Sequence, residues 1–116
     1  MENLATLLAP LPPPIGDLTR RLVTMLAAHP GLEGKVMAGW KSVNFRHRRA
    51  GYVCAVFPNA ERVALYFEHG RLLSAEEGLL QGTELKRGRY MTFVPDAEIP
   101  IDSIGILVAE AIALAA

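Results

Sequence analysis

Cysteine is almost absent from the sequence, since Cys54 is the only one among 116 residues. A single cysteine excludes an internal disulfide and the zinc sites that are built from several cysteines. Long apolar runs are also missing, because no stretch approaches the roughly 20 residues that cross a bilayer as a helix. The first residues, MENLATLLAPLPPP, lack the basic start and the uninterrupted apolar segment of a signal peptide. We therefore expect a cytoplasmic protein without a membrane partner.

Net charge is absent as well, because 12 basic and 12 acidic residues balance. A neutral chain has no overall field that would draw it onto phosphate or anionic lipid. The charge is uneven along the chain, however. Residues 34–60 contain five basic residues and no acid, whereas residues 90–116 contain four acids and no base.

Catalytic and metal-binding motifs are missing too. The sequence has no glycine-rich phosphate loop, HExxH or GxSxG motif, and His29, His47 and His69 share no ligand spacing. Cys54 lies within an apolar stretch that is typical of a strand, so we expect a packed thiol rather than a nucleophile. No catalytic residue, metal site or cofactor is predicted, and the pattern argues against an enzyme without excluding one.

Apolar residues, at 51% of the chain, are sufficient for one core, so residues 1–116 are predicted to form a single domain. A short helix is expected before the proline run. A second helix, N-capped by Asp17, follows to about Ala28, with an apolar stripe at helical spacing. A closing helix, capped by Asp102 or Ser103, is apolar nearly all round, which indicates either deep packing or a subunit contact.

Four strands are predicted between the second and the closing helix, at residues 35–46, 52–57, 62–69 and 89–94. Short connections favour antiparallel pairing. Ser74 and Glu77 have the spacing of a capping box, which predicts one helical turn before the last strand. The predicted fold is therefore a two-layer α+β domain in the order α-α-β-β-β-β-α, with helices on one face of a mainly antiparallel sheet.

Side chains alternate across a sheet, so the parity of each strand predicts its two faces. One parity gathers all four phenylalanines and is expected under the helices: Val43, Phe45, Val53, Ala55, Phe57, Val63, Leu65, Phe67, Met91 and Phe93. The other parity gathers the tryptophan and all three tyrosines: Trp40, Ser42, Asn44, Tyr52, Cys54, Val56, Ala64, Tyr66, Glu68, Tyr90, Thr92 and Val94. Because Trp and Tyr have a polar tip, the second face is predicted to be an aromatic surface in contact with solvent or a partner.

The leading hypothesis is a non-catalytic binding module whose aromatic face holds a small molecule or a protein partner. Asn44 and Glu68 would orient the ligand, and Arg46 or Arg89 would neutralise an anionic group. The predicted binding residues are Trp40, Asn44, Arg46, Tyr52, Tyr66, Glu68, Tyr90 and Arg89.

Three other interpretations use the same features. Tyrosines on an open sheet face stabilise a sheet without any ligand. The aromatic face or the closing helix could form a homodimer. Aromatics beside the basic run Arg46 to Arg49 suit single-stranded nucleic acid, although the zero net charge and Glu68 on the same face weigh against that partner.

Several stretches resemble the bacterial YdhG-like domain-of-unknown-function family: LLAPLPPP, GWKSVNF, GYVCAVFP, ERVALYFEHGRLL, EEGLLQG and RYMTFVPD. The resemblance covers almost the whole chain and implies a two-layer α/β fold without an established activity. One branch of that family is described as a frataxin-like iron chaperone in bacilli, which implies iron binding as an alternative function. Such iron binding is associated with a dense acidic helix and sheet edge, whereas the corresponding region here contains only Glu2, Asp17 and Glu33.

Overall fold

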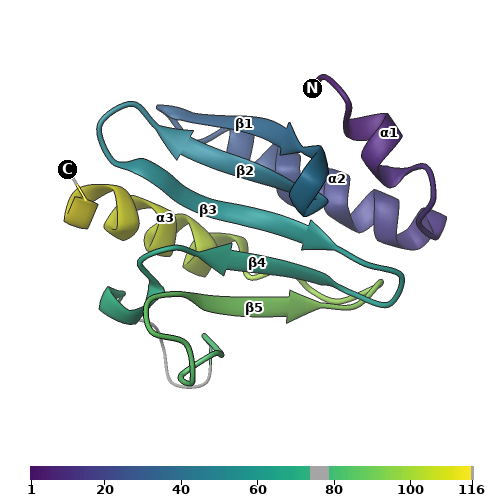
Figure 1. Ribbon diagram of the computed structural model, residues 1–116. Coiled ribbons are helices and arrows are strands. Elements are labelled where there is room, and N and C mark those ends of the chain that lie inside the picture. Colours follow the sequence, from purple (N-terminus) through teal and green to yellow (C-terminus); the bar gives the residue numbers. More distant parts are fainter. Residues whose placement is uncertain (74–78, 116) are drawn as a thin grey trace.

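A five-stranded antiparallel sheet with helices on one face forms the domain in the computed structural model, which describes residues 1–73 and 79–115. The strands lie in chain order, β1-β2-β3-β4-β5, and α2 and α3 pack against the same side of the sheet (Figure 1). The elements are α1 (Leu4–Leu8), α2 (Pro13–Ala27), β1 (Leu32–Met37), η1 (Ala38–Trp40), β2 (Ser42–His47), β3 (Gly51–Pro58), β4 (Val63–Phe67), η2 (Gly70–Leu72), β5 (Arg89–Phe93) and α3 (Ile101–Ala115). The predicted α+β class is confirmed.

The number of strands was predicted wrongly, because the expected strand at residues 35–46 is two strands. A 3₁₀ turn at Ala38–Trp40 interrupts it, and Lys41 has a positive φ of 54°. The chain reverses there, so that β1 and β2 pair as an antiparallel hairpin with Met37 opposite Ser42. The sheet gains an edge strand that the sequence pattern did not reveal.

The second helix begins earlier than predicted. It starts at Pro13, so Asp17 lies inside the helix and is not its N-cap. Proline suits the first turn of a helix because it has no backbone N–H to satisfy and its φ is already helical. Leu18, Leu22 and Leu26 of the predicted stripe are buried against the sheet.

The closing helix, α3, buries the predicted core positions Ile104, Leu107, Val108 and Ala111. Its outer side is not deeply packed, since Ile106 is 67% exposed and Leu114 is 52% exposed. No helix within residues 1–73 and 79–115 has both the length and the apolar character needed to span a bilayer. The helical turn predicted at residues 74–77 lies outside the described residues.

A β-bulge in β3 changes the predicted faces. Phe45 lies opposite Cys54, but the next residue, Arg46, lies opposite Tyr52, so Val53 has no counterpart on β2. Such an extra residue shifts the alternation of side chains along the strand. As a result Tyr52 and Cys54 point to opposite faces although they are two residues apart.

This bulge overturns four assignments of the parity argument. Cys54 and Val56 lie on the helix-covered face, opposite Phe67 and Leu65 of β4. Ala55 and Phe57 lie on the other face, opposite Tyr66 and Ala64. The four phenylalanines therefore do not share one face, because Phe57 lies on the open face and packs against Tyr66. Val53, at the bulge itself, is buried as expected.

Candidate functional site: an aromatic cleft on the open sheet face

The face of the sheet that the helices leave open carries most of the predicted binding residues. Residues directly opposite one another in antiparallel strands project to the same face. Asn44 lies opposite Ala55, which lies opposite Tyr66, and Tyr66 lies opposite Tyr90. Arg46 follows Asn44 on this face by alternation along β2, and the bulge in β3 brings Tyr52 opposite Arg46.

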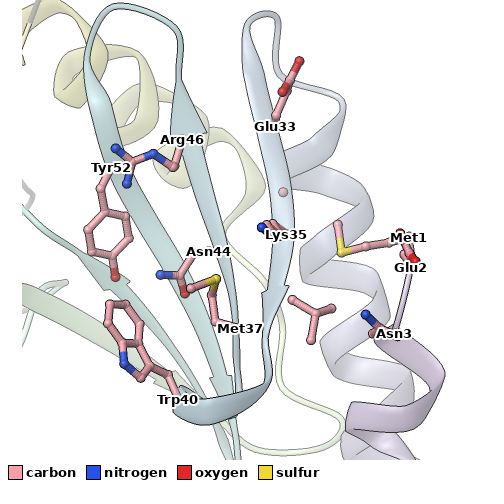
Figure 2. A pocket seen from close by; sticks show the side chains of 12 residues that line it. Met1, Glu2, Asn3, Glu33, Lys35, Met37, Trp40, Asn44, Arg46 and Tyr52 are labelled. Carbon is pink, nitrogen blue, oxygen red and sulfur yellow. The ribbon is translucent and has the colours of Figure 1, made fainter.

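Four predicted residues from different elements line one hollow: Trp40 from η1, Asn44 and Arg46 from β2, and Tyr52 from β3. We call this part of the hollow the aromatic cleft. The whole hollow has a volume of about 500 Å³ and continues around β1 to the N-terminal residues. In Figure 2 the rings of Trp40 and Tyr52 lie on one side of β1, whereas Met1, Glu2 and Asn3 lie on the other side.

The 3₁₀ turn presents the indole of Trp40 to solvent. The turn is closed by the amide of Lys41, which donates to the carbonyl of Ala38 over 3.2 Å. Trp40 is 59% exposed, an unusual fraction for a side chain with so much apolar surface. An indole exposed in this way can offer a ring face to a ligand without any rearrangement of the core.

Asn44 forms the polar floor of the aromatic cleft. The hydroxyl of Ser42, which is fully buried, donates to Asn44 Oδ1 over 2.7 Å and so orients the amide. Within the described part of the chain, the amide nitrogen of Asn44 has no protein acceptor, and no buried side-chain polar atom lacks a partner. The nitrogen therefore reaches the cleft, and Figure 2 shows it on the side of the two rings.

Tyr66 extends the aromatic surface away from the cleft. Its ring lies 6.4 Å from that of Tyr52 and 6.3 Å, edge to face, from that of Phe57. Its hydroxyl donates to Glu68 Oε1 over 2.8 Å. Glu68 therefore already has a partner inside the protein, and the predicted role of orienting a ligand would require that bond to be shared.

Both tyrosines nearest the cleft keep their protons in neutral solution. Burial, followed by the nearby charge of Glu68, raises the pKa of Tyr52 well above its usual value. Burial and the hydrogen bond to Glu68 raise the pKa of Tyr66 to about 12, although Arg87 acts in the opposite direction. Their hydroxyls can exchange hydrogen bonds with a ligand, but they are unsuited to act as bases near pH 7.

The cations predicted at the strand ends lie in different places. Arg46 is exposed on the open face, and among the residues described here the only ion pair joins Arg62 to Glu61, so Arg46 has none. Arg89 lies opposite Phe67 and so belongs to the helix-covered parity. Its guanidinium donates to the carbonyls of Leu85 and Gly88 at 3.1 and 2.7 Å.

The structure thus brings together Trp40, Asn44, Arg46 and Tyr52, places Tyr66, Glu68 and Tyr90 farther along the same face, and separates Arg89 from them. The sequence argument missed Ser42 as the residue that orients Asn44, and it missed the contribution of β1. Glu33 and Lys35 lie opposite Arg46 and Asn44 and border the cleft. If the turn at residues 38–40 had been recognised, the alternation of side chains along β1 would have placed Glu33 and Lys35 on the same face as Asn44.

Among the described residues, few side chains have the properties that catalysis or metal binding requires. Cys54 is fully buried, as predicted, and burial raises the pKa of its thiol to about 12. Within residues 1–73 and 79–115 no three His, Cys, Asp or Glu side chains lie close enough to hold a metal ion together. The assembled groups are ring faces, an amide donor, hydroxyls and a guanidinium, which are the groups of a binding site.

Comparisons with protein-family models, with curated proteins and with solved structures gave no match to this chain. The resemblance to the YdhG-like family rests on the sequence motifs alone and stays a prediction.

Proposed function

We propose that the protein is a non-catalytic binding module and that the aromatic cleft holds a small planar molecule with an anionic group. The observation that carries this proposal is the exposed indole of Trp40 beside Tyr52, above an amide whose orientation is already fixed. Ring faces of this kind stack on planar ligands, and each such contact contributes about 1–3 kcal/mol when the ligand is a nucleobase.

The polar groups of the cleft select the chemistry of the ligand. The amide nitrogen of Asn44 is a donor without a protein acceptor among the described residues, and Arg46 is a cation without an ion pair among them. Both groups favour a ligand that accepts hydrogen bonds or carries negative charge. Glu33, opposite Arg46, limits this preference, since it would repel an anion placed on its side of the cleft.

The extent of the hollow is also compatible with a small molecule. The whole hollow, about 500 Å³, lies within the range of pockets that take drug-sized ligands, and the aromatic cleft is the part of it on the open face of the sheet. Pre-formed order strengthens the case for Asn44, because the hydrogen bond from Ser42 already orients its amide. Little conformational entropy would be lost when a ligand binds to this amide.

The test follows the indole N–H of Trp40 in a proton–nitrogen NMR spectrum, where a single tryptophan gives one side-chain signal. Aromatic carboxylates and nucleoside monophosphates are added as separate pools, followed by their neutral amides and nucleosides. We expect the signal to shift with one anionic pool. A decathymidine and ferrous iron, added separately, test the nucleic-acid and iron alternatives.

Two arginine variants sharpen this experiment. Arg46→Gln is expected to weaken binding of the anionic probe by roughly tenfold or more, because a charge-assisted hydrogen bond is lost, while the neutral analogue binds as before. Arg48→Gln is the matched control, since Arg48 is an exposed arginine of the same hairpin that does not line the cleft. If no pool moves the indole signal, or if calorimetry, which does not depend on that signal, finds the same affinity in Trp40→Ala, the proposal is wrong.

A further inference from the structure

The two edges of the sheet differ in how their backbone groups are used. At the β5 edge, Gln81 pairs with Tyr90 through two backbone hydrogen bonds of 2.8 and 2.9 Å, and Arg71 N donates to Arg87 O. At the β1 edge, the described residues contain no strand or bridge outside β1 (Figure 1). An open edge of this kind is a template for another strand.

The side chains of β1 alternate in a simple way. Leu32, Gly34 and Val36 lie opposite His47, Phe45 and Val43 and so project to the helix-covered face. Glu33, Lys35 and Met37 project to the open face. Edge strands usually carry a lysine that discourages pairing, but here Glu33, two residues before Lys35, supplies the opposite charge on the same face.

We infer that β1 pairs with β1 of a second copy of this chain, antiparallel and centred on Gly34, so that the two sheets join across a two-fold axis. In this register Glu33 lies opposite the partner's Lys35, and Lys35 lies opposite the partner's Glu33. Opposite charges in directly paired positions stabilise antiparallel strands. On the helix-covered side, Leu32 lies opposite the partner's Val36, an apolar pair.

Neighbouring registers are less favourable. A two-fold axis at Glu33 would place the two Glu33 carboxylates against one another, and an axis at Lys35 would do the same with the two ammonium groups. Centring on Gly34 avoids both repulsions. It also extends a row of alternating charge, since Arg46 lies opposite Glu33 within the chain and the partner's Lys35 follows.

The N-terminal residues lie beside β1 but are not paired with it. The methyl group of Met1 lies 2.6 Å from the point that a Cβ on Gly34 would occupy, which places this side chain on the helix-covered side. The backbone hydrogen bonds described for residues 1–3 run to Leu4 and Leu7 of α1, not to β1. A second strand at this edge therefore displaces side-chain packing of Met1 rather than backbone hydrogen bonds.

Charge reversal tests the register. Sedimentation equilibrium should show a dimer of the full chain in the micromolar range. Lys35→Glu alone creates two acid–acid pairs, and Glu33→Lys alone creates two base–base pairs, so each should weaken dimerisation by about tenfold or more. An equimolar mixture of these two variants should form a heterodimer. The double variant Glu33→Lys/Lys35→Glu should dimerise more strongly than either single variant, although residue 33 then lies opposite Arg46 with the same charge.

Three results would overturn the inference: a monomer at several hundred micromolar, a dimer that ignores both charge reversals, or a mixture of the two variants that stays monomeric. Ile106→Lys is the control for the exposed face of α3, and loss of the dimer in that variant alone would assign the contact to α3 instead. Trp40→Ala should leave the dimer intact, so failure of the proposed ligand function would not be confused with failure of this pairing.

Discussion

The two faces of the sheet differ in how deeply their side chains are buried. On the helix-covered face, Val43, Phe45, Leu65 and Phe67 are completely buried. On the open face, Tyr52, Tyr66 and Tyr90 are half-buried and pack mainly against one another and their cross-strand neighbours. Burial of apolar area is the dominant stabilising term of a small domain, so the covered face maintains the fold while the open face can carry polar groups, which we propose to serve binding.

Replacing one phenylalanine on each face should give the largest contrast. Phe67→Ala, on the covered face, is expected to lower the free energy of unfolding by about 3–5 kcal/mol because it leaves a cavity in the core. Phe57→Ala, on the open face, loses a partly exposed ring and one edge-to-face contact with Tyr66, so we expect a loss of about 1–2 kcal/mol. Urea denaturation followed by circular dichroism measures both. Equal losses would show that the open face is as tightly packed as the covered one.

As the pH rises above neutral, the first loss of stability should come from Cys54 on the helix-covered face. The pKa of Cys54 is raised from 9.0 to about 12, so between these values the folded chain keeps a proton that the unfolded chain loses. The stabilising contribution is therefore complete below about pH 9 and declines as the pH rises toward 12, by at most ~1.4 kcal/mol per pH unit. Urea denaturation at pH 8 to 11 should show this slope.

Cys54→Ala is the variant that separates this contribution from that of the tyrosines. The slope should become shallower between pH 9 and 10, below the range where Tyr66, whose usual pKa is 10.0, begins to contribute with the same sign. An unchanged slope in Cys54→Ala would contradict the assignment to the thiol. In the original chain, thiol reagents should modify Cys54 only as fast as the protein opens.

The hydrogen bond from Tyr66 to Glu68 should have a smaller effect. Tyr66→Phe removes the donor but keeps the ring, so we expect the free energy of unfolding to fall by about 1 kcal/mol. The hydrogen bond joins two half-buried groups, and solvent can take the place of the hydroxyl. Tyr90→Phe is the matched control, because no hydrogen bond of its hydroxyl is described. Similar losses in both variants would show that ring packing, not this bond, sets the contribution of Tyr66.

The sequence was most informative where one periodicity extended through a whole element. The predicted core stripe of α3 at Ile104, Leu107 and Val108 was correct, because residues at this spacing lie on one face of a helix and are buried together. The face shared by Trp40, Asn44, Tyr66 and Tyr90 was also correct. These positions either lie on regular strands or, like Trp40, directly precede one.

The errors arose where the physical signal was ambiguous. Around Ala38–Trp40 the residues remain apolar or small, so a turn and a continuing strand look alike until β1 is seen to pair with β2. At the bulge, Val53 and Cys54 are both apolar, and neither parity of β3 is clearly the buried one. Only the register with β2 and β4 decides which of them faces the helices. Ser42 and Asn44 were correctly placed on one face of β2, but alternation along a strand does not say which side-chain atoms bond, so their hydrogen bond was not predicted.

The smallest effect on stability is expected at Trp40, the residue that is central to the proposed binding. Trp40 is 59% exposed and belongs to a turn rather than to the core, so Trp40→Ala should change the free energy of unfolding by less than about 0.5 kcal/mol. Unfolding must be followed by circular dichroism, because the variant has no tryptophan fluorescence. A loss above roughly 1 kcal/mol would mean that the indole supports the sheet, and its ring face would then not be free for a ligand. An unchanged stability together with lost ligand binding would separate the two faces most clearly, since a large aromatic side chain would be shown to serve recognition and not folding.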